Sequence, residues 1–151
     1  MKQSAGDLVD ISQVQGCTCL RLRRATRQVT RLYDRALEPA DITVTQFGIL
    51  AHLHCRDDIA MGTLADWIGM DPTTLSRTLK PLLARDWIRI GADPEDRRIR
   101  AIRITEAGRA KLREAIPMWS QAQQTVETIV GRPTVLALNG LLDLSAEKIG
   151  V

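Results

Sequence analysis

The spacing of apolar and polar residues predicts helices over most of the chain. Apolar positions recur at helical spacing over residues 17–37. A second helix follows, which Thr43 or Thr45 can cap and which ends near Cys55. A short third helix stops at Gly69, because glycine readily adopts the left-handed conformation that ends many helices.

A fourth helix has a clear start and two distinct faces. The Asp71 carboxylate can accept hydrogen bonds from the first N–H groups, and Pro72 fits the first helical position, where its missing donor costs nothing. Pro81 is expected to bend or loosen the last turns. The apolar face is predicted to be buried and consists of Leu75, Leu79, Leu82 and Leu83. The small polar and basic residues of this helix are Thr73, Thr74, Ser76, Arg77 and Lys80.

The period changes to that of β-strands after the fourth helix. Residues 87–90 and 99–104 each read as a strand, and residues 91–96 between them are rich in turn formers. They predict a β-hairpin. A long helix is expected over residues 105–131, and Pro133 opens an apolar last helix.

Three short helices followed by a two-stranded hairpin indicate a winged helix-turn-helix over residues 38–105. The fold class is therefore mainly α with a small β-hairpin wing. The polar face of the fourth helix suits a DNA major groove, and the hairpin arginines suit phosphates or a minor groove. Ordinary solvent exposure of these residues and a purely structural hairpin are the alternatives. The candidate DNA-binding residues are Thr73, Thr74, Ser76, Arg77, Lys80, Arg97, Arg98 and Arg100.

Charge distribution supports a polyanionic partner. The net charge is only +3, but Arg97, Arg98, Arg100 and Arg103 fall within seven residues that include no acid. A solvated run of charge is one alternative. A second alternative is a protein of another class, a dimeric interaction module that binds an acidic protein through its basic hairpin.

Composition indicates a folded domain of 151 residues, with 44% hydrophobic and 26% charged residues. No uncharged apolar run approaches the roughly 18 residues that span a membrane, and residues 1–16 lack the apolar stretch of a secretory signal. Three cysteines are an odd number, which suits a reducing compartment. We therefore expect a soluble cytoplasmic protein.

Motifs of catalysis are absent from the sequence. It contains no HExxH, CxxC, P-loop, GxSxG or GxGxxG pattern, so neither an enzyme nor a cofactor is expected. Cys17, Cys19 and Cys55 could hold a soft metal, but their spacing matches no standard ligand motif. We expect no metal, and core or loop positions for these cysteines.

Residues 93–98 read DPEDRR, and residues 102–108 read IRITEAG. These motifs are similar to the wing signature of the MarR family of bacterial transcription regulators, which the chain resembles. The fourth helix and Trp87 also match that family. The resemblance implies that Arg77 reaches the major groove and that Arg97 or Arg98 reaches the minor groove. It also implies that Asp71 and Asp96 position the wing, with Asp71 paired to Arg98.

The resemblance further implies a homodimer. Residues 17–37 and 106–149 would form the helical dimerisation region, residues 38–105 the DNA-binding domain, and residues 1–16 an N-terminal extension. It also implies a repressor that a small effector, typically an aromatic or phenolic acid, releases from a palindromic operator. The arginines of the first helix and Trp119 are candidates to line the effector pocket.

Residues 18–22 and 28–33 resemble the organic-peroxide-sensing OhrR branch of the same family. In that resemblance Cys19 falls on the reactive cysteine, and Tyr33 falls on a tyrosine that binds its sulfur from the other subunit. Two further tyrosine positions of the branch are Arg23 and Val44 here. A thiol-based sensor of peroxide is therefore an alternative to the small-molecule effector, and a buried structural Cys19 is the alternative to both.

Overall fold

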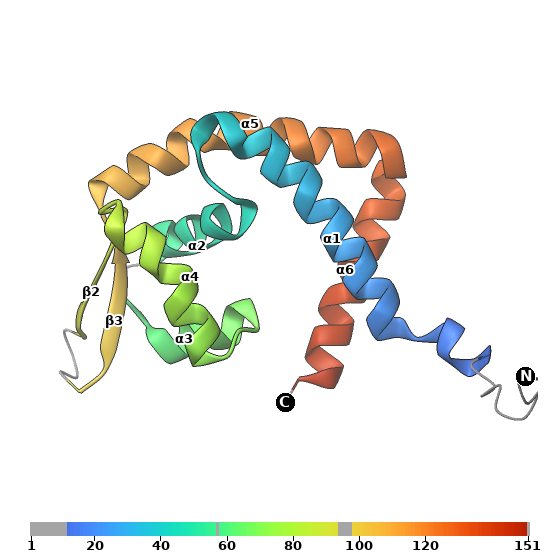
Figure 1. The fold of residues 1–151 in the computed structure, drawn as a ribbon, viewed down its shortest axis with the longest axis horizontal. Helices are drawn as coiled ribbons and strands as arrows, with labels where there is room; N and C mark the ends of the chain where they lie inside the picture. Colours follow the sequence, from blue (N-terminus) through green and yellow to red (C-terminus); the bar gives the residue numbers. More distant parts are fainter. Residues whose placement is uncertain (1–11, 57, 94–97, 151) are drawn as a thin grey trace, which may run out of the picture.

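The computed structural model describes residues 12–56, 58–93 and 98–150 (Figure 1). Two short 3-10 helices, η1 (Ser12–Gly16) and η2 (Glu38–Ala40), flank the first α-helix. The strands are β1 (Ile59–Ala60), β2 (Ile88–Ala92) and β3 (Arg100–Ile104). The α-helices are α1 (Thr18–Leu37), α2 (Val44–Cys55), α3 (Met61–Ile68), α4 (Pro72–Ala84), α5 (Glu106–Val130) and α6 (Arg132–Ile149).

Local cap signals set the helix boundaries. At the start of α2, the Thr43 side chain accepts a hydrogen bond from the Gln46 backbone N–H, and the Gln46 side-chain oxygen accepts one from the Thr43 backbone N–H, which together form a capping box. The Thr105 side chain caps α5 through the Gly108 N–H, at 3.0 Å. Gly69 ends α3 in the left-handed conformation, with φ of 68°. These boundaries confirm the predicted helices, and α4 continues through Pro81 to Ala84.

Over the described residues the sheet has three strands, where the sequence predicted two. All pairs are antiparallel in the order β1-β3-β2, with Ile59 opposite Ile102 and Ile88 opposite Ile104. The prediction missed β1 because two residues are too few to show an alternating pattern. β1 exists because its backbone completes the hydrogen bonds of the β3 edge.

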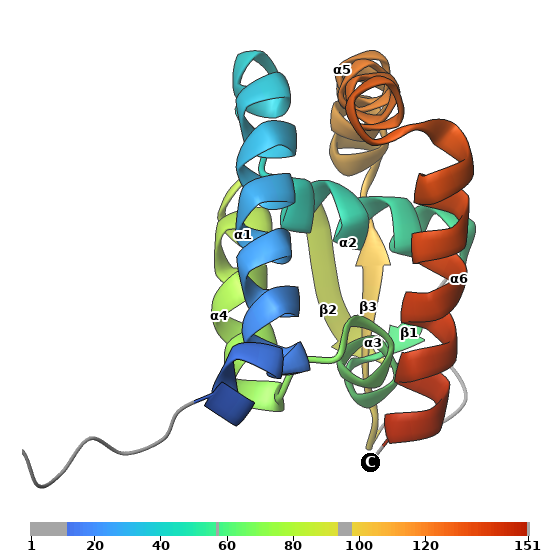
Figure 2. The ribbon, with the colours of Figure 1, turned by 90° about the vertical axis from the view of Figure 1, so that its right-hand side faces the viewer.

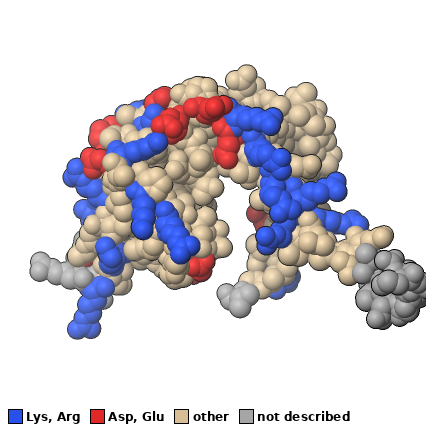
Figure 3. All heavy atoms as spheres, in the orientation of Figure 1, with Lys and Arg blue, Asp and Glu red and all other residues tan. Residues whose placement is uncertain are grey.

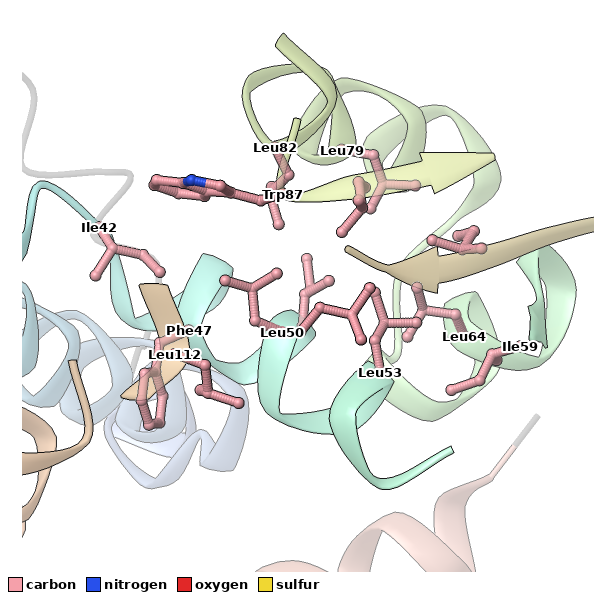
Figure 4. Close-up of a cluster of buried hydrophobic side chains, with 14 of the residues drawn as sticks. Ile42, Phe47, Leu50, Leu53, Ile59, Leu64, Leu79, Leu82, Trp87 and Leu112 are labelled. Atoms are coloured by element: carbon pink, nitrogen blue, oxygen red, sulfur yellow. The ribbon is translucent and has the colours of Figure 1, made fainter. Parts of the chain in front are cut away.

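The core lies between α2, α3, α4 and the sheet, and the start of α5 covers one end of it (Figure 4). Leu50, Leu53 and Leu64 are fully buried there. Leu83 is not, because it points about 100° away from Leu82 around α4, and 38% of its surface is exposed. The prediction of a buried Leu83 was wrong.

Most of α1, the later part of α5 and α6 extend away from the core, and we call this part of the molecule the arm (Figure 1). α5 leads away from the sheet, α1 packs along α5, and α6 turns back from the end of α5. In Figure 2, α1 and α4 lie on one side of the molecule and α5 and α6 lie on the other. None of the described helices is long and apolar enough to cross a membrane.

Many large apolar side chains of this arm are exposed to solvent. They come from α1, the end of α5 and most of α6. These residues are Leu20, Leu22, Val29, Ile129, Val130, Leu136, Leu138, Leu141, Leu142, Leu144 and Ile149.

Candidate nucleic-acid interface

The first turn of α4 is held by Asp71. Its Oδ1 accepts hydrogen bonds from the backbone N–H groups of Thr73 and Thr74, both at 3.0 Å, and its Oδ2 accepts one from the Thr74 hydroxyl at 2.5 Å. The Thr74 hydroxyl and the two N–H groups lower the pKa of the Asp71 carboxyl, because they stabilise its charged form. The sequence predicted this cap, and the structure confirms it.

The two faces of α4 separate clearly. Leu75, Leu79 and Leu82 are buried against the core. The remaining predicted site residues of this helix are all exposed, which leaves their hydroxyl, guanidinium and ammonium groups accessible to a partner. They are Thr73, Thr74, Ser76, Arg77 and Lys80.

The wing carries exposed arginines beside α4. Arg98 and Arg100 are both exposed. Arg98 lies just before β3, and Arg100 is its first residue. Arg97 and Asp96 lie outside the described residues. The described contacts of Asp71 are all with the first turn of α4, so its pairing with Arg98 stays a prediction.

Arg103, on β3 of the hairpin, forms an ion pair. Its guanidinium lies 2.6 Å from the Asp58 carboxylate, next to β1. The run of hairpin arginines is therefore neutralised at its far end. The sequence did not show this pair, because it depends on the unpredicted pairing of β1 with β3.

The C-terminal end of α4 is also anchored, by residues that sequence reasoning missed. Arg85 and Lys111 both lie over the ring of Trp87, at 4.8 and 5.5 Å from its centroid. Each also donates a hydrogen bond to a carbonyl of the turn that follows α1: Arg85 to Asp41 and Lys111 to Ala40. Cations stacked on an indole are attracted by the negative face of the ring. The only signal in the sequence is the Arg85-Asp86-Trp87 run after the helix.

Basic side chains gather on the face that α4 and α1 share (Figure 3). They lie in two areas, one over α4 and the wing and one along α1, and acidic side chains lie mostly near the top of the view. A positively charged surface favours the binding of a polyanion.

The three cysteines lie at or near the ends of helices α1 and α2. Cys17 precedes α1 and is half-buried, while Cys19 in the first turn and Cys55 at the end of α2 are exposed. The expectation that they occupy core or loop positions is therefore wrong for Cys19 and Cys55. Among the described residues no group of three or more His, Cys, Asp or Glu side chains is placed to hold a metal ion.

Tyr33 is buried within its own protomer. Its hydroxyl donates a hydrogen bond to the Gln123 side chain on α5, and burial raises its pKa, with a smaller effect from Glu127. Cys19 lies fourteen residues earlier on α1, about 21 Å along the axis. A contact between Tyr33 and Cys19 would therefore have to join two subunits.

Trp119, predicted as a possible lining residue of an effector pocket, packs on the core. Its ring stacks on Phe47, with the ring centroids 5.7 Å apart. The arginines of α1 are exposed.

The helices α2 to α4 and the sheet define a winged helix-turn-helix protein. Residues 42–99 match the MarR family. The transcriptional regulator MosR of M. tuberculosis, solved in complex with DNA, is 38% identical to this chain, with a TM-score of 0.76. The comparison covers 89% of this chain and 99% of MosR. The chain belongs to the MarR family of transcription regulators.

Other relatives match over shorter stretches or in fold alone. The multiple antibiotic resistance protein MarR of Salmonella typhimurium is 35% identical over 80 residues, which are 53% of this chain and 56% of that protein. The chain thus spans about half the length of this curated relative. A mutant of E. coli MarR, complexed with operator DNA, has the same fold at 23% identity, with a TM-score of 0.78 over 91% of this chain and 99% of that one.

Proposed function

We propose that this protein is a sequence-specific DNA-binding transcription regulator that acts in the cytoplasm. The observation that carries the proposal is the exposed polar and basic face of α4, capped by Asp71 and flanked by the arginines of the wing. The DNA complex of the related MosR supports it.

In this function α4 enters a major groove. The Arg77 guanidinium can bind two acceptors of one guanine, and the hydroxyls and Lys80 bind phosphates or base edges. Arg98, Arg100 and the predicted Arg97 bind phosphates or the adjacent minor groove. Asp71 and Asp96 position the wing.

The DNA-binding form is a homodimer. The exposed apolar residues of α1, the end of α5 and α6 need a partner surface, and a second copy supplies an identical one. Residues 17–37 and 106–149 form this dimerisation region, residues 38–105 bind DNA, and residues 1–16 are an N-terminal extension. Two copies related by a twofold axis read a palindrome whose half-sites lie about one helical turn apart.

The dimer can be tested with matched leucine variants. Leu138→Glu combined with Leu141→Glu should give a monomer in light scattering after gel filtration, because charged groups would replace apolar ones on α6. Leu83→Glu, which alters a similarly exposed leucine on α4, should remain a dimer. If the α6 variant is also a dimer, the dimer interface lies elsewhere.

We propose further that the dimer is a repressor and that a small aromatic or phenolic acid releases it from DNA. Binding of a panel of such acids, followed by loss of operator binding, tests this step. Acids that bind without changing DNA affinity would rule out this class of effector.

Selection of fragments from the source genome tests the function itself. The purified full-length protein should enrich a few palindromic fragments, and a labelled duplex from one of them should bind with salt-dependent affinity. Binding without any sequence preference would contradict the proposal and favour an interaction module for an acidic protein.

A second candidate for the release step is oxidation of Cys19, the alternative that the OhrR resemblance implies. Its support is that the Cys19 thiol is exposed in the first turn of α1, within the proposed dimerisation region. Tyr33 of the other subunit would then approach the sulfur.

A further inference from the structure

One side of α1 carries a regular series of arginines, Arg21, Arg24, Arg27, Arg31 and Arg35, which we call the arginine row. They recur every three or four residues, so at about 100° per residue they fall within about 120° of the helix circumference. At a rise of about 1.5 Å per residue the row is about 21 Å long. The exposed apolar residues Leu22 and Val29 lie on the other side of the helix.

The arginine row has no acidic partner among the described residues. All five side chains are exposed, and no Asp or Glu occurs over residues 11–33. Asp34 and Glu38 lie near Arg35, at the end of the row. Within the described part of the chain, the only hydrogen bonds that these side chains make are to backbone carbonyls, from Arg21 to Gln15 at 3.3 Å and from Arg31 to Arg27 at 3.2 Å. By contrast, Arg113 on α5 lies 2.8 Å from the Glu106 carboxylate.

Such a row opposes helix formation in isolation, because like charges three and four residues apart on one helix repel each other. A bound polyanion would remove that repulsion.

The arginine row and the recognition surface share one side of the molecule. α1 and α4 lie together on the side opposite α5 and α6 (Figure 2), and the basic side chains of both appear on one face (Figure 3). In Figure 1, α4 lies between the wing and α1. A duplex bound to the wing and α4 would therefore continue toward α1.

The symmetry of the proposed dimer indicates which part of the operator the arginine row would contact. α1 and α6 carry exposed apolar residues, so the twofold axis of the proposed dimer would pass near them. Figure 1 shows the wing on the far side of α4 from α1, so α1 would lie closer to this axis than the wing. We propose that the arginine row binds backbone phosphates in the operator segment between the two half-sites. This inference rests on the proposed function, since it requires a DNA-binding dimer.

Arginine suits this role because its planar guanidinium forms two parallel hydrogen bonds with a phosphate. Contacts to phosphates add affinity and fix the register of the protein but read no sequence. The row would therefore add affinity for any DNA sequence, whereas Arg77 would add affinity for one base, and this difference can be measured. Double-stranded DNA is favoured over an acidic protein because the row lies on the same side as α4.

The test compares two full-length variants with the same change in net charge. The first is Arg24→Gln/Arg27→Gln/Arg31→Gln in the arginine row. The control is Arg113→Gln/Arg132→Gln/Lys148→Gln, on α5 and α6. Operator affinity is measured over a range of salt concentrations, together with affinity for an unrelated duplex, and gel filtration and circular dichroism check the dimer and the fold.

The row variant should reduce the slope of log K against log salt by about 0.9 for each lost phosphate contact, so by about 5.4 for three contacts in each of the two protomers of the dimer. The ratio of operator to unrelated affinity should stay the same. The control should keep the wild-type slope, and so should Arg24→Lys/Arg27→Lys/Arg31→Lys. A row variant with the wild-type slope would overturn the inference.

A modified operator locates the contacts. Uncharged methylphosphonates in place of the phosphates between the half-sites should weaken wild-type binding and leave the binding of the row variant almost unchanged. Equal weakening of both proteins would also overturn the inference. If the wild-type protein shows no preference for any palindrome, the proposed function fails instead, which distinguishes the two failures.

Discussion

Arg85 binds Asp41 at two points, one on its backbone and one on its side chain. Arg85 Nη1 donates a hydrogen bond to the Asp41 carbonyl at 2.6 Å, and Nη2 lies 2.8 Å from Oδ2 of the carboxylate. Asp41 adopts the left-handed conformation, with φ of 50°, in the turn between η2 and α2. The contact therefore joins the end of α4 to the turn that follows α1, and both ends of it lie within the proposed DNA-binding domain, residues 38–105.

We expect Arg85→Gln to lower the free energy of unfolding by about 1 kcal/mol. The ion pair itself is worth little, because 39% of the Arg85 side chain and 82% of the Asp41 side chain are exposed. Most of the loss should come from the hydrogen bond to the carbonyl and from the contact with Trp87. Urea unfolding followed by tryptophan fluorescence measures it. Asp41→Asn, which keeps the carbonyl, should lose less, and an equal loss would show that the carboxylate carries the contact.

Gly108 in the first turn of α5 should tolerate no side chain. A Cβ atom there would overlap the Trp87 carbonyl oxygen and lie 2.8 Å from Cγ1 of Ile104. The Trp87 carbonyl cannot move away, because it accepts the Thr105 N–H at 3.0 Å. We expect Gly108→Ala to lower the free energy of unfolding by about 3 kcal/mol.

Gly48→Ala is the matched control for Gly108. Gly48 lies inside α2, where a Cβ would meet no atom within 4 Å, so alanine should raise stability by up to about 1 kcal/mol. Chemical unfolding of both variants measures the contrast. A Gly108→Ala protein as stable as the wild type would show that α5 can shift away from β2.

The Asp71 cap should make stability depend on pH in the acid range. The pKa of its carboxyl is lower in the folded protein than its ordinary value of 3.8, chiefly because of the Thr74 hydroxyl. Its contribution to stability is therefore complete above about pH 4 and is lost as the pH falls through the lower, folded-state pKa. Asp71→Asn keeps a capping oxygen but does not titrate. The urea midpoint of the wild type should thus fall more steeply below pH 4 than that of Asp71→Asn, and parallel curves would contradict this account.

The sequence predicted best what depends on neighbouring residues. The caps at Thr43, Asp71 and Thr105 and the two faces of α4 follow from residues within one or two turns. They were sufficient to place α4 and the wing in order, and so to indicate the class of fold.

What the sequence did not predict depends on residues far apart in the chain. The pairs Arg85–Asp41 and Arg103–Asp58 each join residues more than forty positions apart, so no local pattern shows them. β1 forms only because β3 offers an open edge. Leu83 was placed in the core because four leucines at helical spacing resemble one stripe, although the buried face of α4 holds only three of them.

Arg77→Ala and Arg98→Ala should impair DNA binding in different ways. Loss of Arg77, on the exposed face of α4, should cost about 1–3 kcal/mol of binding and relax the preference at one base position. Loss of Arg98, on the wing, should weaken binding to all sequences and reduce the salt slope by about 0.9 for each protomer, so by about 1.8 for the dimer. Affinities for a set of single-base operator variants at several salt concentrations separate the two effects. If both variants bind the operator as the wild type does, the assigned DNA face is wrong.

Oxidation of Cys19 should reduce operator affinity if the thiol is the sensor. Cumene hydroperoxide would convert the thiol to a sulfenic acid and be reduced to the alcohol, and a small thiol would then displace water to form a mixed disulfide. The added group would occupy the first turn of α1, where the proposed dimer packs, and would shift the two recognition helices from their spacing.

Titration of the purified dimer with the hydroperoxide, in the presence of glutathione, tests the sensor. Operator binding should fall with the wild type and with Cys55→Ser, whose lost thiol is also exposed but lies at the end of α2. Binding should persist with Cys19→Ser, and mass spectrometry should find the mixed disulfide on Cys19. Tyr33→Phe should lower the peroxide sensitivity if the hydroxyl of the other subunit holds the sulfur. An oxidised wild type with unchanged DNA affinity would remove the sensor hypothesis and leave release by a small acid as the remaining proposal.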